Sequence, residues 1–327
     1  MSRICYNSNM KKQSKKFDVI TIGGATCDIL FYSKDGELIS TSNATKQKLL
    51  AFEYGAKIYA DKIYNEVGGG ANNASVAFAR LGLKAAVVCA IANDDNGKAI
   101  LSNFKANKVD TSLIKLDSKN STGFSVILTV NNESKEHIAF LHRGANENLS
   151  AKDLPISKLN ADWFYISALP KNNWKPMMDE IVKLDRNIVW NPGMKQLNDI
   201  AAVKKYLPNV KVLIINHDEA LEFKKLKEIK GLLAHIFTLG PKLVIITDGE
   251  KGAYAFDGKK YYFIKAKEVK AANTIGIGDA FGSALTCGLV YGKNIKDSLK
   301  WGINNSASVV SKIGAQKGLL TLNQIKR

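Results

Sequence analysis

Cysteine and histidine are scarce in this sequence, and their spacings argue against two classes of protein. The chain of 327 residues has four cysteines and four histidines. No two cysteines have the two-residue spacing of a zinc or redox site, and three lie in the apolar runs "GATCDIL", "AVVCAIA" and "ALTCGLV". Such thiols are expected to be buried and reduced, which argues against a disulfide scaffold. The histidines form no cluster with metal-ligand spacing, so we expect no structural zinc.

The sequence also lacks a long apolar run. The first apolar stretch follows the basic and polar residues 1–16 and is interrupted by Asp18 and Asp28. It therefore fits neither a signal peptide nor a membrane span. We expect residues 1–16 to be a disordered basic tail, and the protein to be cytoplasmic with no membrane partner.

Arginine is rare in a chain that is strongly basic. The formal net charge is +17, yet only five of the 47 basic residues are arginine. Lysine is a point charge and lacks the bidentate fork with which arginine recognises bases and phosphates. We interpret the charge as a solvated surface and expect no specific nucleic-acid partner, although the positive field would attract acidic ligands.

Apolar strands and helical patterns alternate along most of the chain. The stretch "FDVITIGG" (17–24) is continuously apolar, which is typical of a strand buried on both faces. Such alternation predicts an α/β fold, a doubly wound and mostly parallel sheet with helices on both faces. Further strands are expected at 84–92, 161–169, 187–190, 210–216 and 242–248.

Two segments break this alternation. Residues 33–66 are polar, with short strands expected at 48–52 and 56–64, and residues 122–142 read as a hairpin with one apolar face. We expect these segments to meet as a small β sheet over one edge of the core. The predicted α/β core comprises 17–32, 67–119 and 146–327, and the predicted β lid comprises 33–66 and 120–145.

The stretch "NTIGIGDAF" (273–281) places two glycines and an aspartate where a loop leads into a predicted helix. The N–H groups at a helix N-terminus are unpaired and attract anions. Gly276 and Gly278 would allow a phosphate to approach the backbone closely. Asp279 would then be placed to accept a proton from a hydroxyl that attacks a phosphoryl group. The alternative is a glycine turn with Asp279 as a helix cap.

Two familiar phosphate-binding motifs are absent. The Rossmann pattern needs a third glycine where this chain has Phe281, and the Walker ending Gly-Lys-Ser/Thr occurs nowhere. Phosphoryl transfer by this protein would therefore use another scaffold.

Two further motifs follow predicted strands, and ligands bind beyond the carboxyl ends of strands in such sheets; a third motif precedes a predicted helix. Asn216 and Glu219 of "NHDE" offer oxygen ligands to a hydrated magnesium ion. The alternative is that Asn216 or Asp218 is a helix N-cap, followed by acidic residues in the first turn. Asp28 of "GGATCD" is an acceptor for paired sugar hydroxyls, or a capping residue after a turn. In "GGGANN" (68–73) the glycines precede a helix, and the two asparagines either cap that helix or face a ligand.

Together these motifs resemble the ribokinase-like (PfkB-type) carbohydrate kinases, over a stretch from about Phe17 to Gln316. The family's C-terminal signature, Asp-Thr-Thr-Gly-Ala-Gly-Asp-Ala-Phe, corresponds to "NTIGIGDAF", and its N-terminal signature corresponds to "GGGANNASVAFARLG". Its Asn-x-x-Glu motif reads "NHDE" and its Thr-x-Gly-x-x-Gly segment reads "TDGEKG" (247–252). The stretch "RGAN" (143–146) is similar to the Pro-Gly-Ala-Asn of ribokinases.

The resemblance implies ATP-dependent phosphoryl transfer to a hydroxymethyl group of a small sugar. Asp279 would be the base, the amides of residues 276–278 would form the anion hole, and Asn216 and Glu219 would hold Mg²⁺ through water. The lid would close over the sugar and exclude water, and it is also the expected contact of a homodimer. The implied nucleotide-binding residues are Thr247, Gly249, Gly252 and Asn305, and the implied acceptor-binding residues are Asp28, Gly69, Gly70 and Asn73.

Three residues depart from the C-terminal signature. Asn273 replaces the usual aspartate and Ile275 the usual threonine, in a stretch that contributes to a monovalent-cation loop in K⁺-activated members. These two changes weaken the expectation of K⁺ activation. Ile277 replaces a small alanine in the anion hole, where only its backbone N–H is needed.

Two alternatives remain open at this point. A nucleoside kinase of the same fold would need an aromatic platform for the base. A non-catalytic relative would use its positive field to bind a polyanion, although the intact Asp279 and glycines argue against it. The lid residues that would supply a platform are Phe52, Tyr54, Phe124 and Phe140.

Overall fold

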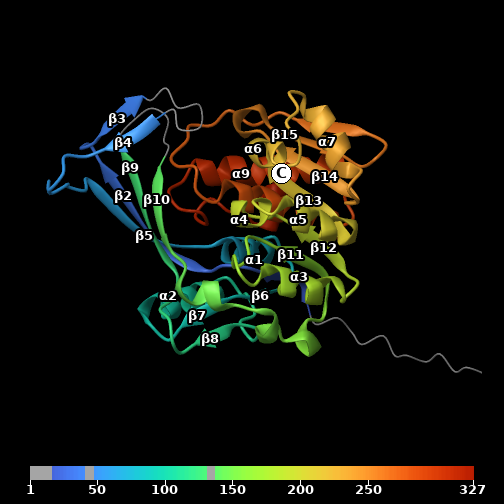
Figure 1. The fold of residues 1–327 in the computed structure, drawn as a ribbon, viewed down its shortest axis with the longest axis horizontal. Coiled ribbons are helices and arrows are strands. Elements are labelled where there is room, and N and C mark those ends of the chain that lie inside the picture. The colour runs from blue at the N-terminus through green and yellow to red at the C-terminus, as the bar shows by residue number, and fades with distance from the viewer. Residues whose placement is uncertain (1–16, 41–47, 131–136) are drawn as a thin grey trace, which may run out of the picture.

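An eight-stranded sheet forms the centre of this protein in a computed structural model that describes residues 17–40, 48–130 and 137–327 (Figure 1). The predicted tail at 1–16 lies outside the described residues. The strand order is β16-β15-β14-β13-β12-β11-β1-β6. The strands from β14 to β6 are parallel, whereas β15 and β16 add antiparallel strands at one edge. The strands are β1 (Phe17–Ile22), β6 (Ala85–Val88), β11 (Ala161–Ile166), β12 (Asn187–Trp190), β13 (Val210–Asn216), β14 (Leu243–Thr247), β15 (Ala253–Phe256) and β16 (Tyr261–Ile264).

Helices cover both faces of this sheet, as the alternating pattern predicts. One apolar core lies under α3 (Trp174–Val182), α5 (Ile200–Tyr206) and α7 (Ile229–Phe237). The other lies under α1 (Gly70–Arg80), α8 (Ile277–Val290) and α9 (Ile295–Val310). The predicted doubly wound α/β fold is therefore confirmed. The remaining named elements beside this sheet are β7 (Ala90–Ala92), α2 (Asp95–Ala106), β8 (Lys115–Asp117), α4 (Met194–Leu197), α6 (His217–Leu221) and α10 (Leu322–Ile325).

A four-stranded sheet stands beside the α/β core (Figure 1). Its order is β10-β9-β2-β5, from Ile138–His142, Phe124–Val130, Thr26–Ser33 and Lys62–Gly68, respectively. Strands β9 and β10 form the predicted antiparallel hairpin, whose connection at 131–136 lies outside the described residues. The short pair β3 (Glu37–Ser40) and β4 (Lys48–Ala51) forms a separate two-stranded sheet.

Strand β2 is the main difference from the sequence-based expectation. It pairs with β5 on one side and with β9 on the other, so it joins the two segments that were expected to meet directly. Asp28 therefore lies within a strand and does not cap a turn. The strand predicted at 56–64 begins at Lys62 and runs to Gly68, because pairing with β2 sets its limits. The division of the chain into core and lid stays a prediction, and its boundary at residue 32 falls at the end of β2.

Within the described residues, no helix combines the length and the apolar character needed to cross a membrane.

Candidate active site

Helix α8 begins without a side-chain cap. Its N-cap is Gly276, with φ 72°, and no side chain in the described part of the chain accepts a hydrogen bond from its first turn. The first N–H groups of a helix have no partner within the helix, and the helix dipole adds positive potential there. The start of α8 therefore offers free N–H donors to an anion.

The two glycines at this helix start differ in backbone conformation and in the space on their Cβ side. Gly276 has a positive φ, and a methyl group added to it would collide with Ala315. Gly278 is exposed, and a methyl group added to it would meet no atom within 4 Å. The fold requires the first glycine, whereas the second leaves open space in front of the helix.

Asp279 lies half-buried in the first turn of α8 and is held by one amide. Its Oδ2 accepts a hydrogen bond from Asn73 Nδ2 at 2.8 Å. Burial raises the pKa of Asp279, the bond from Asn73 opposes this rise, and the negative charge of Asp28 adds to it. The buried hydroxyl of Tyr165 lies under the same helix against Gly282, and its pKa is also raised by burial and by the charge of Asp279. The surroundings therefore make Asp279 a stronger base than an exposed aspartate.

Asp28 is buried on β2 and faces the same region. Its Oδ1 accepts hydrogen bonds from Ser125 Oγ at 2.6 Å and Thr26 Oγ1 at 3.0 Å. Burial raises the pKa of Asp28, and the two hydroxyl donors partly offset this rise. No residue within 17–40, 48–130 or 137–327 donates a hydrogen bond to its Oδ2, so this oxygen remains available to a ligand.

The glycines and asparagines at the start of α1 lie between these two carboxylates. A methyl group added at Gly70 would lie 3.3 Å from Asp279 Oδ1, and Gly69, the N-cap of α1, packs against the Gly24 carbonyl. The helix begins at Gly70, so the two asparagines lie inside it and do not cap it. Asn73 faces Asp279, whereas its neighbour Asn72 is fully buried and donates to the Gly68 carbonyl at 3.0 Å.

The predicted magnesium residues form a capping box in this structure. Asn216 Oδ1 accepts from the Glu219 N–H at 2.8 Å, and Glu219 Oε2 accepts from the Asn216 N–H at 2.9 Å. Burial raises the pKa of Glu219. Asn216 ends β13 directly beside Thr247, which ends β14, so both lie at the carboxyl edge of the sheet. The structure therefore shows the helix cap, and it leaves Glu219 Oε1 outside that box.

The predicted nucleotide segment follows Thr247 as a tight turn. Gly249 has a positive φ and open space on its Cβ side, whereas Gly252 packs against the Ile264 carbonyl. Within the turn, Asp248 forms an ion pair with Lys251 at 3.0 Å.

Asn305 does not line a surface. It is fully buried, its Nδ2 donates to the Ala280 carbonyl at 2.8 Å, and its Oδ1 accepts from the Leu320 N–H at 2.9 Å. Its neighbour Asn304 instead borders a hollow of about 330 Å³. Helical periodicity could have predicted this burial, because Asn305 lies four residues from Trp301 and from Val309 and so shares their buried face. The hollow is lined by Lys267, Val269, Asn304, Ala307, Ser308, Ser311, Leu320, Gln324 and Arg327.

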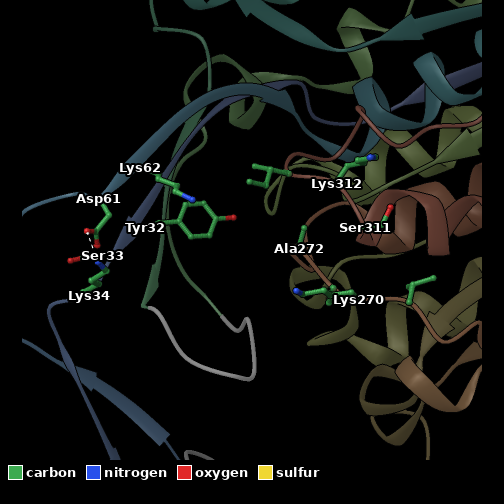
Figure 2. A pocket seen from close by; sticks show the side chains of 12 residues that line it. Tyr32, Ser33, Lys34, Asp61, Lys62, Lys270, Ala272, Ser311 and Lys312 are labelled. Atoms are coloured by element: carbon green, nitrogen blue, oxygen red, sulfur yellow. Dashed lines mark ion pairs between the residues drawn. The ribbon is translucent and has the colours of Figure 1, made fainter.

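A larger cleft, of about 690 Å³, separates the small sheet from the core. Figure 2 shows Tyr32 projecting from the small sheet toward the core segments that carry Lys312 and Ala272. Four lysines line this cleft, and one of them, Lys34, pairs with Asp61 at 3.7 Å. The cleft is therefore positively charged. The lysines are Lys34, Lys62, Lys270 and Lys312.

The aromatic side chains that were predicted as a base platform do not line this cleft. Tyr54 is fully exposed, Phe140 is 61% exposed, and the Phe124 ring lies 5.2 Å from that of His142. Phe52 contacts Gly36 instead. Tyr32 is the aromatic residue of the cleft, and the sequence-based list missed it because β2 was not expected to form part of the small sheet.

A parallel sheet that carries an open helix N-terminus at its edge, with a small β sheet across a cleft, is the architecture of ribokinase-like kinases. The solved adenosine kinase of Sinorhizobium meliloti matches with a TM-score of 0.79 at 20% identity, over 95% of this chain and 99% of that one. A putative ribokinase II of E. coli, solved with ATP and Mg²⁺, matches with a TM-score of 0.76 at 18% identity, over 94% and 97%.

The chain belongs to the pfkB family of carbohydrate kinases, whose sequence model matches residues 36–322. An ATP-dependent 6-phosphofructokinase of Thermoanaerobacterium thermosaccharolyticum is 24% identical over 334 aligned residues, which cover 98% of this chain and 96% of that protein. The resemblance seen in the motifs is therefore confirmed, and the protein is an enzyme of the kinase class.

Proposed function

We propose that this protein transfers the γ-phosphoryl group of ATP to a hydroxymethyl group of a small sugar, with Asp279 as the base. One observation carries the proposal: an uncapped helix N-terminus has a half-buried carboxylate of raised pKa in its first turn. Phosphoryl transfer needs charge neutralisation and an oriented acceptor, and this pairing supplies both at one place.

The carboxylate and the helix N-terminus have separate parts in the transfer. Ionised Asp279 accepts the proton of the acceptor hydroxyl as the hydroxyl oxygen attacks the γ-phosphorus, and the bond from this phosphorus to the β–γ bridging oxygen breaks to release ADP. The N–H groups of Gly276, Ile277 and Gly278 stabilise the negative charge on the phosphoryl oxygens. A raised pKa brings the base closer to neutral pH, where proton transfer is most efficient.

The acceptor occupies the region between Asp28, Gly70, Asn73 and Asp279. Asp28 Oδ2 accepts hydrogen bonds from sugar hydroxyls, and Gly70 borders the same region, where a methyl group would lie 2.8 Å from Ser167 Cβ and 3.3 Å from Asp279 Oδ1. The small sheet already contacts the core through an ion pair between Glu66 and Lys317 and through His137, whose Nδ1 lies 3.3 Å from Thr274 Oγ1. We therefore assign the small sheet the part of a lid that excludes water.

The nucleotide extends from the start of α8 toward the hollow beside Asn304. Val269 and Ala307 offer apolar surface there, and Asn304 offers a hydrogen-bonding amide to the base. In this proposal the phosphates of the nucleotide lie near Thr247, Gly249 and Gly252. Asn305 supports the site by tying α9 to the first turn of α8.

The residues present fit a hydrated magnesium ion. Among the described residues no three His, Cys, Asp or Glu side chains form a metal-binding group, but Mg²⁺ beside phosphates keeps several waters and needs few protein ligands. Glu219 Oε1 and the second lone pair of Asn216 Oδ1 would hold it through water. When bound, Mg²⁺ would neutralise phosphate charge.

We further propose that activity does not depend on K⁺. The Nδ2 group of Asn273 donates to the Lys312 carbonyl, and its Oδ1 accepts from the Ile275 N–H at 2.7 Å. The Asn273 amide thus donates a hydrogen to the Lys312 carbonyl oxygen. An ionised aspartate at this position has no hydrogen to donate, and a bound cation would be needed between its carboxylate and that carbonyl.

A nucleoside kinase is the second candidate function. Tyr32 favours it, because its ring faces the cleft and would stack on a base. The small sheets also expose apolar side chains, which supports the proposal of a homodimer through the lid. These side chains are Leu38, Ile39, Leu49, Ile63, Phe140 and Leu141.

The direct test is a panel of pentoses, hexoses, phosphorylated hexoses and nucleosides in a coupled assay of ADP release. We expect turnover with a sugar in the wild type and none above background in Asp279→Asn, which should still bind nucleotide. Absence of turnover with every acceptor would contradict the proposed reaction, and turnover with nucleosides alone would establish the second candidate.

A further inference from the structure

A chain of four side-chain amides lies behind Asp279. Asn107 Nδ2 donates to Asn103 Oδ1 at 3.2 Å, and Asn103 Nδ2 donates to Gln316 Oε1 at 3.0 Å. Gln316 Nε2 donates to Asn73 Oδ1 at 3.0 Å, and Asn73 Nδ2 donates to Asp279 Oδ2 at 2.8 Å. Every amide in the chain points its donor toward the carboxylate. The members come from α2, from the segment after α9 and from α1, so tertiary structure alone brings them together.

The groups at the two ends of this chain of amides fix the direction in which its hydrogen bonds are donated. At the far end, Asn107 Nδ2 also donates to the Asn103 main-chain carbonyl at 2.9 Å, and a carbonyl can only accept. At the near end, an ionised Asp279 can only accept as well. Each amide between them has one donor end and one acceptor end, so the orientation of each follows from its neighbours. Asn73 and Gln316 are 4% and 9% exposed, which leaves little room for water to replace a missing partner.

We propose that Gln316 and Asn103 are positioning residues for the base: they hold Asn73 with its N–H toward Asp279. This inference rests on the proposed function, in which Asp279 is the base. The donated hydrogen bond stabilises the ionised carboxylate and occupies Oδ2, so that Oδ1 is the oxygen presented to the acceptor. Without Gln316, the Asn73 amide is free to turn and to place its own oxygen against the carboxylate.

The other groups around Asp279 cannot replace this donor. Asp28 on β2 carries a negative charge and raises the pKa of Asp279. Tyr165 on β11 lies under α8, and its hydroxyl forms no hydrogen bond with a described residue. Ser167, directly after β11, donates to the Ile22 carbonyl at 3.4 Å. Asn73 is therefore the neutral donor that keeps the pKa of the base from rising further.

The decisive variant is Gln316→Glu. It keeps the shape of the side chain and still accepts from Asn103, but it cannot donate to Asn73. The Asn73 amide is then expected to turn toward the new carboxylate and to present its oxygen to Asp279. We expect the acid limb of the kcat/KM profile to move up by about one pH unit, with about tenfold lower turnover on that limb. The KM for ATP should stay unchanged. Gln316→Met leaves Asn73 free in either orientation and should give a smaller shift in the same direction.

Two matched variants separate orientation from charge and from packing. Asn72 Oδ1 accepts from Asn103 Nδ2 at 3.4 Å, so Asn72→Asp places a carboxylate beside the chain while it leaves the four donors in place. It also removes the Asn72 bond to the Gly68 carbonyl, so its effect on the acid limb reports a nearby charge together with the loss of that bond. Gln196→Glu removes a donor from another buried amide, which bonds to the Leu169 carbonyl and has no link to Asp279. This control should lower the thermal stability without moving the acid limb.

A second readout does not require turnover. Carboxyl ¹³C NMR titration, with the Asp279 signal assigned through Asp279→Asn, should show a higher pKa for Asp279 in Gln316→Glu than in the wild type. An equal pKa in the two proteins, or an equal rise in Asn72→Asp, would overturn the positioning role whether or not the wild type is active. A raised pKa in a protein that phosphorylates no acceptor would support the positioning role while the proposed reaction fails.

Discussion

Helices α8 and α9 pack against each other, and each carries an aspartate at its third position, yet these aspartates lie in opposite environments. In α9, Asn294 Oδ1 caps the Asp297 N–H at 2.9 Å, and Lys300 pairs with the carboxylate at 3.0 Å. These partners lower the pKa of Asp297. In α8, no side chain of the described residues caps the helix, and burial raises the pKa of Asp279. The same residue at the same helical position is a capped and ion-paired residue in one helix and the candidate base in the other.

The largest expected effect comes from neutralising each aspartate in turn. Asp279→Asn should lower turnover at least about 100-fold, because an amide cannot accept the proton. Asp297→Asn should leave turnover unchanged. Steady-state kinetics on the two purified variants provides the measurement, and an equal loss in both would break the comparison.

The same pair should respond in opposite ways to pH in thermal unfolding. The raised pKa of Asp279 means that its ionisation destabilises the folded state as the pH rises from the unfolded value of 3.8 through the folded value. Asp279→Asn should therefore melt higher than the wild type above this window. The lowered pKa of Asp297 stabilises the folded state above 3.8, and this gain is lost as the pH falls through the folded value. Asp297→Asn should melt lower than the wild type at neutral pH, with the difference vanishing in acid.

The two glycines at the start of α8 should separate catalysis from folding. Gly276→Ala should cost about 1–3 kcal/mol of stability, because its backbone is left-handed and its Cβ side is occupied by Ala315. Gly278→Ala should fold normally and lower turnover at least about tenfold, because the added methyl group enters the open space proposed for phosphate. Chemical denaturation and turnover of both variants check this pair. Full activity of Gly278→Ala would show that the phosphate does not occupy the open space beside Gly278.

Two neighbouring asparagines of α9 should show a smaller contrast. Asn305→Ala leaves the Ala280 carbonyl and the Leu320 N–H without a partner, at a cost of about 1–3 kcal/mol for each group. Asn304→Ala should keep its stability and raise the KM for ATP about three- to tenfold, through loss of one hydrogen bond. An unchanged KM would remove the hollow from the proposed nucleotide site.

The smallest expected effect is that of the monovalent cation. Because Asn273 already donates to the Lys312 carbonyl, turnover should be the same in potassium chloride and in choline chloride at equal ionic strength. Clear activation by potassium would show that the loop before α8 takes up a cation despite this amide.

Local patterns accounted for most of the elements. Within 68–82 a glycine loop was predicted to lead into a helix that stops at Gly82, and this helix is α1 at Gly70–Arg80. The predicted strand 210–216 is β13 within the same limits, because its apolar run is buried from both faces. Strand β2 could not be placed in this way, because its partners β5 and β9 lie far along the chain. Helical periodicity could have predicted that Asn305 is buried, but the family resemblance led us to expect it in the nucleotide site.

The sequence by itself determined the α/β alternation, the glycines at the start of α8 and the presence of an aspartate beside them. These are local properties, since periodicity and a positive φ depend on residues close together in the chain. Only the tertiary structure decided which aspartate is buried and which amide faces it. Asn73 and Gln316 are 243 residues apart, yet both belong to the hydrogen-bonded chain that ends at Asp279. A pKa depends on burial and on neighbours in space, and folding alone brings those neighbours together.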